Sequence, residues 1–227
     1  MKKLSILLFG FIIICIGEDT RATDLTGKFA LSGMGGISYL MGNGFSSEGK
    51  IKNNYGFGVS LEYFFLKELS GGLALVSNSF QGDWIKSSYH LRGCCYSTDW
   101  NWTSVSIFGK FVLDPETKIS PYLKGGVGLY IPWIKDWWYY PPNTSYTHKS
   151  YGRGQFGWYF GVGIQYRLSK KMFLSLDIPL NVIYTDGLVI HWIDLPRMME
   201  RYHKIYEKSH YFNFFAGVSF LFGTKKK

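Results

Sequence analysis

Large apolar residues occupy every second position in two successive stretches of this chain, Phe156–Leu168 and Met172–Tyr184. The apolar positions are Phe156, Trp158, Phe160, Val162, Ile164, Tyr166 and Leu168 in the first stretch, and Met172, Leu174, Leu176, Ile178, Leu180, Val182 and Tyr184 in the second. The positions between them are mostly glycine or polar. A period of two is that of a β-strand, and each stretch is long enough to cross a bilayer at a tilt. The two stretches therefore predict a hairpin of membrane-spanning strands.

The same period recurs along the rest of the chain and predicts six more strands. These strands cover, approximately, Lys28–Leu40, Asn54–Phe65, Leu69–Ser79, Trp100–Leu113, Pro121–Ile134 and His210–Phe222. The connections alternate between long and short, so an antiparallel meander would place every short turn at one end. Transmembrane barrels have short turns at one end and longer external loops at the other. We therefore predict an all-β fold, an eight-stranded antiparallel up-and-down transmembrane β-barrel.

The apolar face of each strand can point into the barrel, as in a soluble barrel, or out to lipid. An inward apolar face would require about forty large side chains in an interior that eight strands leave just wide enough to fill. An outward apolar face leaves glycine, small polar residues and a few charges inside. It also spares cations such as Lys110 a cost of about 2–4 kcal/mol on the lipid face. Volume and charge both favour the membrane barrel.

The charged residues on the inward face form the first candidate site. They are Glu62, Lys110, Lys124, Arg167 and Asp177. Three positive and two negative charges in a narrow lumen are expected to pair, because an unpaired buried charge is costly. A salt-bridged structural core and a gate on an ion path both fit this pattern, and the sequence leaves the choice open.

The N-terminus has the order of residues found in a secretory signal. Two lysines, Lys2 and Lys3, precede the apolar stretch Leu4–Gly17, and a small-residue cleavage site ends at Ala22. We expect a signal peptide over residues 1–22, the barrel domain over 23–223 and a basic tail over 224–227. The expected location of the exported chain is the cell outer membrane.

The net charge and the cysteine content limit the classes of binding partner, metal and cofactor that this chain is expected to have. The formal net charge is +9, which in an exported chain favours outer-membrane lipids and lipopolysaccharide over nucleic acid. After removal of the signal only the neighbours Cys94 and Cys95 remain, and they lack the spacing of metal ligands. We expect no metal and no cofactor.

The aromatic residues Trp137, Trp138, Tyr139 and Tyr140 form the second candidate site, in a predicted loop. Other tryptophans at predicted strand ends and loops are Trp84, Trp100, Trp102, Trp133 and Trp192. Such residues are typical of the aromatic belt at a membrane interface. A loop surface that binds a glycan or a hydrophobic solute is the alternative. The stretch Pro196–Ser209 is interpreted as a short helix in the last long loop.

Several runs of the sequence resemble a known family. They are FGKF (Phe108–Phe111), PYLKGGVGLY (Pro121–Tyr130), FGWYFGVGIQYRLS (Phe156–Ser169) and the terminal YFNFFAGVSFLF (Tyr211–Phe222). Together they resemble the bacterial outer-membrane β-barrel domain family, the OmpA/OmpW-like porin superfamily. The resemblance implies that the outer-membrane assembly machinery recognises the last strand. In the family this strand usually ends the chain with Phe, whereas here Gly-Thr-Lys-Lys-Lys follows Phe222.

The resemblance implies the fold and the location but not one function, because such barrels include pores, adhesins, structural proteins and a few lipid enzymes. A deacylase barrel would show His and Ser two positions apart on a late strand, and the stretch Leu180–Gly187 contains no His. We therefore expect no enzymatic activity. The favoured function is a structural or surface role, with passage of small solutes through a narrow polar lumen left open. The alternative is a surface-loop binding module, an adhesin or a contact for glycan or lipopolysaccharide, and we expect a monomer.

Overall fold

The computed structural model describes residues 25–41, 51–82, 85–86, 95–140, 144–184, 188–194, 199–205 and 209–223. The expected signal peptide, Trp84 and the expected basic tail lie outside these ranges. The strands are β1 (Phe29–Met41), β2 (Ile51–Phe64), β3 (Leu69–Gly82), β4 (Ile85–Lys86), β5 (Cys95–Val112), β6 (Ile119–Tyr140), β7 (Thr144–Tyr151), β8 (Gln155–Arg167), β9 (Met172–Ile183), β10 (Leu188–Asp194), β11 (Met199–Ile205) and β12 (Ser209–Phe222). Within the described ranges no helix has the length and apolar character needed to span a membrane.

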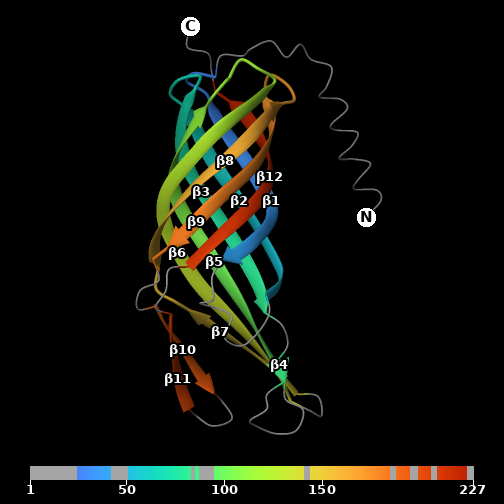
Figure 1. The fold of residues 1–227 in the computed structure, drawn as a ribbon, viewed down its shortest axis with the longest axis vertical. Helices are drawn as coiled ribbons and strands as arrows, with labels where there is room; N and C mark the ends of the chain where they lie inside the picture. Colours follow the sequence, from blue (N-terminus) through green and yellow to red (C-terminus); the bar gives the residue numbers. More distant parts are fainter. Residues whose placement is uncertain are drawn as a thin grey trace, which may run out of the picture.

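Eight of the strands close into an antiparallel barrel (Figure 1). Their order is β5-β3-β2-β1-β12-β9-β8-β6, and a ladder between β5 and β6 completes the ring. The strands β1 and β12, the first and last along the chain, pair from Phe29 opposite Phe222 to Met41 opposite His210. Closure gives each strand a partner on both edges, as a bilayer requires of a spanning sheet. The predicted eight-stranded meander is confirmed.

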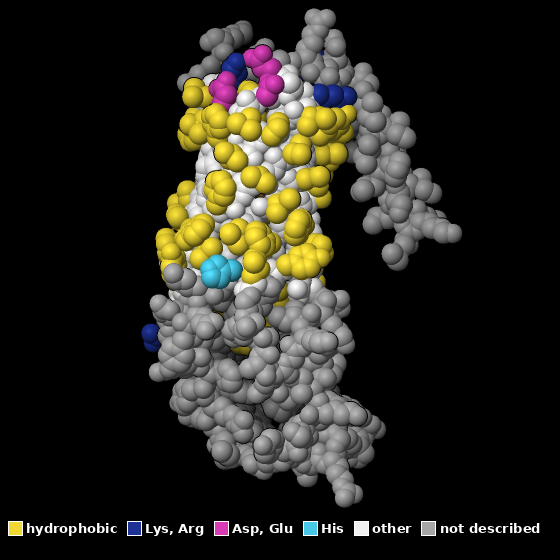
Figure 2. Space-filling model, viewed as in Figure 1, with side chains coloured by type: hydrophobic (Ala, Val, Ile, Leu, Met, Phe, Trp, Pro, Cys, Tyr) yellow, Lys and Arg dark blue, Asp and Glu magenta, His cyan; other side chains and the backbone are white. Residues whose placement is uncertain are grey.

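The outer wall of the barrel is apolar between its two ends (Figure 2). Outward side chains such as Phe57, Ile107 and Leu129 are exposed by 61%, 64% and 57%, as lipid-facing residues are in the absence of lipid. The predicted outward apolar face is therefore confirmed. Two expected wall residues are buried instead. Leu168 lies beyond the end of β8, where strand alternation stops, and Val182 lies opposite Trp158, whose indole donates to the Tyr184 hydroxyl over 3.2 Å.

The wall strands continue past the membrane at the long-loop end. A transmembrane strand needs about 9–11 residues, whereas β5 has 18 and β6 has 22. The second half of β6 pairs with β7 on one edge and with the start of β5 on the other, and β4 extends the same sheet. We call this sheet the arm: β4, Cys95–Asn101, Trp133–Tyr140 and β7.

The arm and a separate hairpin correct three expectations from the sequence. Much of the expected loops over 80–99 and 135–154 is strand, because β5 and β6 stay paired beyond the bilayer. The helix expected over Pro196–Ser209 is wrong. Its central residues form β11, which pairs with β10 from Leu188 opposite Ile205 to Asp194 opposite Met199. Cross-strand pairing outweighs the weak helical propensity of this short segment.

Glycines on the two faces of the wall predict opposite effects of a methyl group. Gly72 lies on the inward face of β3, where a Cβ would clash with the Leu61 carbonyl and lie 2.9 Å from the Glu62 Cα. Gly109 lies on the outward face of β5, where a Cβ would have no neighbour within 4 Å. We expect Gly72→Ala to destabilise the barrel by about 1–3 kcal/mol through overpacking. Gly109→Ala should be neutral or stabilising by about 0.5–1 kcal/mol.

Urea titration of the folded protein in lipid vesicles, followed by tryptophan fluorescence, measures both free energies of unfolding. Equal destabilisation by the two variants would contradict the assignment of inward and outward faces.

Candidate functional site

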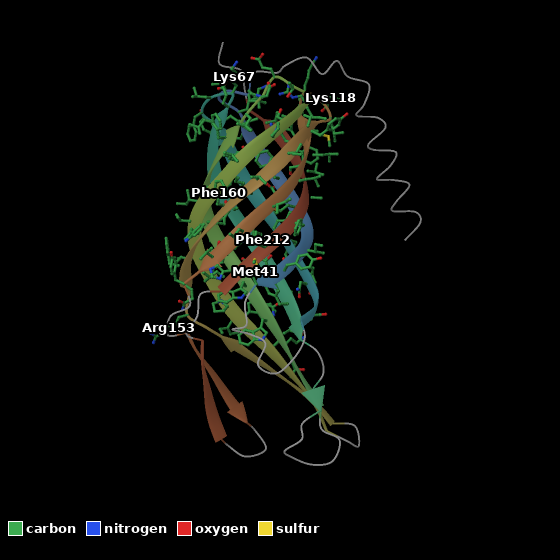
Figure 3. All side chains as sticks on the ribbon, viewed as in Figure 1. Met41, Lys67, Lys118, Arg153, Phe160 and Phe212 are labelled. Atoms are coloured by element: carbon green, nitrogen blue, oxygen red, sulfur yellow. The ribbon has the colours of Figure 1, made fainter. Side chains whose placement is uncertain are left out.

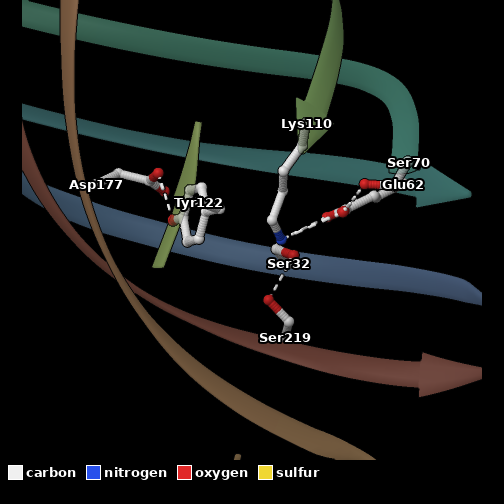
Figure 4. Close-up of polar contacts among 7 residues, drawn as sticks. All are labelled: Ser32, Glu62, Ser70, Lys110, Tyr122, Asp177 and Ser219. Atoms are coloured by element: carbon white, nitrogen blue, oxygen red, sulfur yellow. Dashed lines mark hydrogen bonds and ion pairs between the residues drawn. The ribbon is translucent and has the colours of Figure 1, made fainter. Parts of the chain in front are cut away.

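An ion pair lies in the barrel interior between Glu62 on β2 and Lys110 on β5 (Figure 4). The Lys110 Nζ is 3.2 Å from Glu62 Oε1, and Lys110 and Glu62 are 9% and 5% exposed. Ser70, on the intervening strand β3, donates its hydroxyl to Glu62 Oε1 over 2.5 Å. The ammonium also lies 4.6 Å from the centroid of the Tyr122 ring. A carboxylate, a hydroxyl and an aromatic face thus replace the water that the two charges would otherwise bind.

The other three inward charges do not complete a salt-bridge network among the described residues. Asp177 on β9 accepts a 2.5 Å hydrogen bond from the Tyr122 hydroxyl. Lys124 on β6 lies over the Phe108 ring, with Nζ 4.3 Å from the centroid. Of the five charges expected to pair, Glu62 and Lys110 form an ion pair, and Asp177 and Lys124 contact aromatic residues instead, because strand register and tilt decide which inward side chains meet.

Arg167 is 2% exposed at the short-turn end of β8. One guanidinium nitrogen donates to the Pro115 carbonyl over 2.9 Å, and the group lies over the Phe173 ring, 5.4 Å from its centroid. Asp177 lies on the neighbouring strand opposite Gly163, four residues along β8 from Arg167. Four residues of strand separate the two positions by about 13 Å, so this pair does not form.

An apolar cluster closes the short-turn mouth of the barrel. Its members are Leu25, Ala30, Phe64, Phe173 and Leu221, all buried. Leu25 enters the mouth through a turn in which Gly27 has φ of +77°, a conformation that favours glycine, and Gly27 donates its N–H to the Phe64 carbonyl over 2.8 Å. The sequence pattern did not reveal this plug, since a single turn before a strand has no periodicity.

Aromatic and amide side chains fill the half of the lumen nearer the long loops. Asn78 accepts from the Ser38 hydroxyl over 2.9 Å and donates to the Tyr211 hydroxyl over 3.2 Å. The Tyr130 hydroxyl donates to Asn181 over 3.2 Å. Trp102, opposite Asn78 in the β3–β5 ladder, is 1% exposed. Its expected place in an interfacial belt is therefore wrong, because its position on β5 is an inward one.

Among the described residues, two small cavities lie inside the barrel, with volumes of about 20 and 30 Å³. Met34, Lys124 and Asp177 line both cavities. A water molecule needs roughly 10–15 Å³ measured in this way. Each cavity therefore has room for one or two waters beside the charged groups.

The second candidate site lies apart from the lumen, on the arm. The stretch Trp137–Tyr140 belongs to β6, with Trp137 opposite Ser97 of β5 and opposite Thr147 of β7. The four aromatic residues are thus in a strand, and their expected place in a loop is wrong. Cys95 lies opposite Tyr139 in the same ladder, and Cys94 lies outside the described residues.

A closed antiparallel barrel with an apolar wall and a polar, filled interior defines a transmembrane β-barrel protein. Residues 17–191 match the family model "Outer membrane protein beta-barrel domain". The chain belongs to this family of outer-membrane β-barrels, as its sequence suggested. The strand β12 lies beyond the matched range, and its ladders with β1 and β9 make it part of the same barrel.

Solved structures share the fold at low sequence identity. A major outer membrane protein from Thermus thermophilus has a TM-score of 0.56 at 12% identity, over 87% of this chain and all (100%) of its own. Outer membrane protein AlkL, studied in lipid bilayers, has a TM-score of 0.52 at 15% identity, over 92% and 97%. OprG from Pseudomonas aeruginosa has a TM-score of 0.51 at 12% identity, over 91% and 100%. No curated protein matches the sequence significantly.

The buried ion pair predicts a strong dependence of stability on both partners. We expect Lys110→Met to destabilise the barrel by about 3–5 kcal/mol, because Glu62 is then left as an uncompensated buried charge. The double variant Glu62→Gln/Lys110→Met should recover most of this loss, since both charges are gone. Urea unfolding of the three proteins in vesicles, together with the single variant Glu62→Gln, measures the coupling free energy. Additive losses in the double variant would show that the two residues act independently.

Proposed function

We propose that this protein is a closed-lumen outer-membrane barrel that anchors the arm at the cell surface, and that it does not serve as a diffusion pore. The filling of the lumen carries this proposal. The plug around Leu25, the Glu62–Lys110 pair and the Asn78–Tyr211 contact occupy successive levels of the interior. The two cavities described among these levels have room for one or two waters each. Of the two expected roles of the inward charges, this supports the structural one.

The arm supports a role in surface contact. Its four strands project from the long-loop end of the barrel (Figure 1), the end that faces outward in barrels of this class. Pairing with β5 and β7 fixes the backbone of Trp137–Tyr140 more than a loop would, which lowers the entropic cost of binding. A glycan or the saccharide of lipopolysaccharide is the partner class that we assign to Trp137–Tyr140.

The proposal includes the steps that bring the protein to this location. Export uses a signal peptide over residues 1–22, and the assembly machinery recognises β12. The folded protein acts as a monomer and has no enzymatic activity. Solute passage through the lumen is the competing function. The permeability of liposomes that contain the protein distinguishes solute passage from a closed lumen.

A closed lumen predicts that liposomes containing the protein swell no faster in isotonic sugar than liposomes without protein. The variant Tyr122→Ala/Tyr130→Ala/Tyr159→Ala removes three rings from the lumen and serves as a widened control. We expect swelling or ion conductance only from the widened barrel, because its interior then holds a continuous path for water. Sugar or ion flux through the unaltered protein would overturn the proposal.

The arm predicts loss of binding when its aromatic residues are truncated. Alternate residues of a strand fall on opposite faces, so Trp137→Ala/Tyr139→Ala and Trp138→Ala/Tyr140→Ala test the two faces of β6 separately. With the protein in nanodiscs over immobilised lipopolysaccharide, we expect one pair to weaken binding by at least about tenfold. The other pair is the matched control. If both variants bind as the unaltered protein does, the arm is not the contact surface.

A further inference from the structure

The charged residues at the short-turn rim are divided unequally between its two halves. Figure 3 shows Lys67 and Lys118 at this end of the barrel, with Arg153 at the other. In the half where the β2–β3 turn meets Glu116 of the β5–β6 turn, Lys67 Nζ lies 2.7 Å from Glu116 and 3.6 Å from Glu68. The hydrogen bond and charge of Glu116 raise the pKa of Lys67, and Lys67 in turn lowers the pKa of Glu116. The charge of Lys67 is therefore neutralised by Glu116 and Glu68 within this half of the rim.

Three other lysines of the rim form no ion pair among the described residues. Lys118 precedes β6, and Lys170 and Lys171 form the turn between β8 and β9. All three are exposed, and none forms an ion pair within the part of the chain that the structure describes. We call these three lysines the basic half-rim.

Backbone hydrogen bonds place the basic half-rim along one continuous side of the barrel. The Arg167 N–H donates to the Lys118 carbonyl over 2.8 Å, which joins the start of β6 to the end of β8. The Leu221 N–H donates to the Lys171 carbonyl over 2.7 Å, which joins the β8–β9 turn to β12. The three lysines therefore border the wall formed by β6, β8, β9 and β12.

The wall directly beside these lysines faces lipid. Exposed apolar residues there are Ile119, Ile164, Phe220 and Phe222. The Lys118 ammonium lies 5.1 Å from the centroid of the Tyr166 ring, at the boundary between the apolar wall and the polar rim. Lysine side chains at such a boundary extend their charged ends to the level of lipid headgroups. The phosphate of a lipid whose chains pack on this wall would lie within their reach.

We propose that the basic half-rim binds the phosphate groups of anionic phospholipids in the periplasmic leaflet, and thereby holds these lipids against β6, β8, β9 and β12. Short turns face the periplasm in barrels of this class, so phospholipid is the ligand and the lipopolysaccharide of the outer leaflet is not. Lysines near an anionic lipid surface each contribute to its binding. The proposal is independent of whether the lumen conducts.

The test compares lipids at the wall of the full mature chain in mixed vesicles of phosphatidylglycerol and phosphatidylcholine. Spin-labelled forms of each lipid report, by electron paramagnetic resonance, the fraction immobilised by the protein. The rim variant Lys118→Gln/Lys170→Gln/Lys171→Gln removes the basic half-rim. The control variant Lys86→Gln/Lys135→Gln/Lys149→Gln removes the same charge from the arm. Heat-modifiable gel mobility establishes that each variant is folded.

We expect the unaltered protein to prefer phosphatidylglycerol. The rim variant should reduce this preference by at least about fivefold, the factor that one lysine near an anionic surface contributes. The control variant should retain it, and high salt should reduce the preference of the unaltered protein by screening. No preference in the unaltered protein, or an equal loss in the rim and control variants, would overturn the proposal.

Discussion

The structure depends on one constraint, that a sheet in a bilayer must satisfy all its backbone hydrogen bonds internally. Closure of eight strands, completed by the β1–β12 and β5–β6 ladders, meets this requirement and removes every edge of the spanning sheet. Closure at this strand number also sets the width of the interior, which only side chains fill. Bulky apolar residues must then point to lipid, and the inward positions must be glycine, small, or involved in specific contacts. The apolar wall, the inward glycine Gly72 and the filled lumen are consequences of the same closure.

The narrow lumen also explains why its charges have different kinds of partner. A buried cation needs nearby groups that replace water, and a carboxylate is only one of them. Lys110 meets Glu62, whereas Lys124 lies over the Phe108 ring and Arg167 has a carbonyl and the Phe173 ring. Aromatic faces can stabilise cations where strand register provides no acid. The small cavities beside Lys124 and Asp177 have room for waters that complete their solvation. These contacts fit a stable core better than a gate, because they involve separate strands on different sides of the lumen.

The period of two was sufficient to predict the eight strands, the outward apolar face and the inward set. It could not predict which inward residues meet, because contact across the lumen depends on strand register and tilt, which the period does not report. The pairing of Glu62 with Lys110, and the separation of Arg167 from Asp177, are therefore visible only in the structure. The Leu25 plug escaped prediction because it is one turn without a repeat. The arm escaped because Trp137–Tyr140 is followed by two prolines, which suggest a loop, whereas pairing with β5 and β7 keeps the stretch extended.

A filled interior and a lipid-facing wall leave only the two ends of the barrel for specific recognition. The ends differ in construction: the outer one is a multi-stranded sheet with aromatic residues, and the inner one is a set of short turns whose unpaired lysines, among the described residues, lie on one side. Lysines on that side lie beside the wall, so the lipid that packs on β8 and β9 is also the molecule whose phosphate they can reach. A ligand of the arm, in contrast, must come from outside the bilayer. In the proposed closed-lumen barrel the side chains that fill the interior separate the two ends, so a partner bound at one end would have no direct contact with a partner bound at the other.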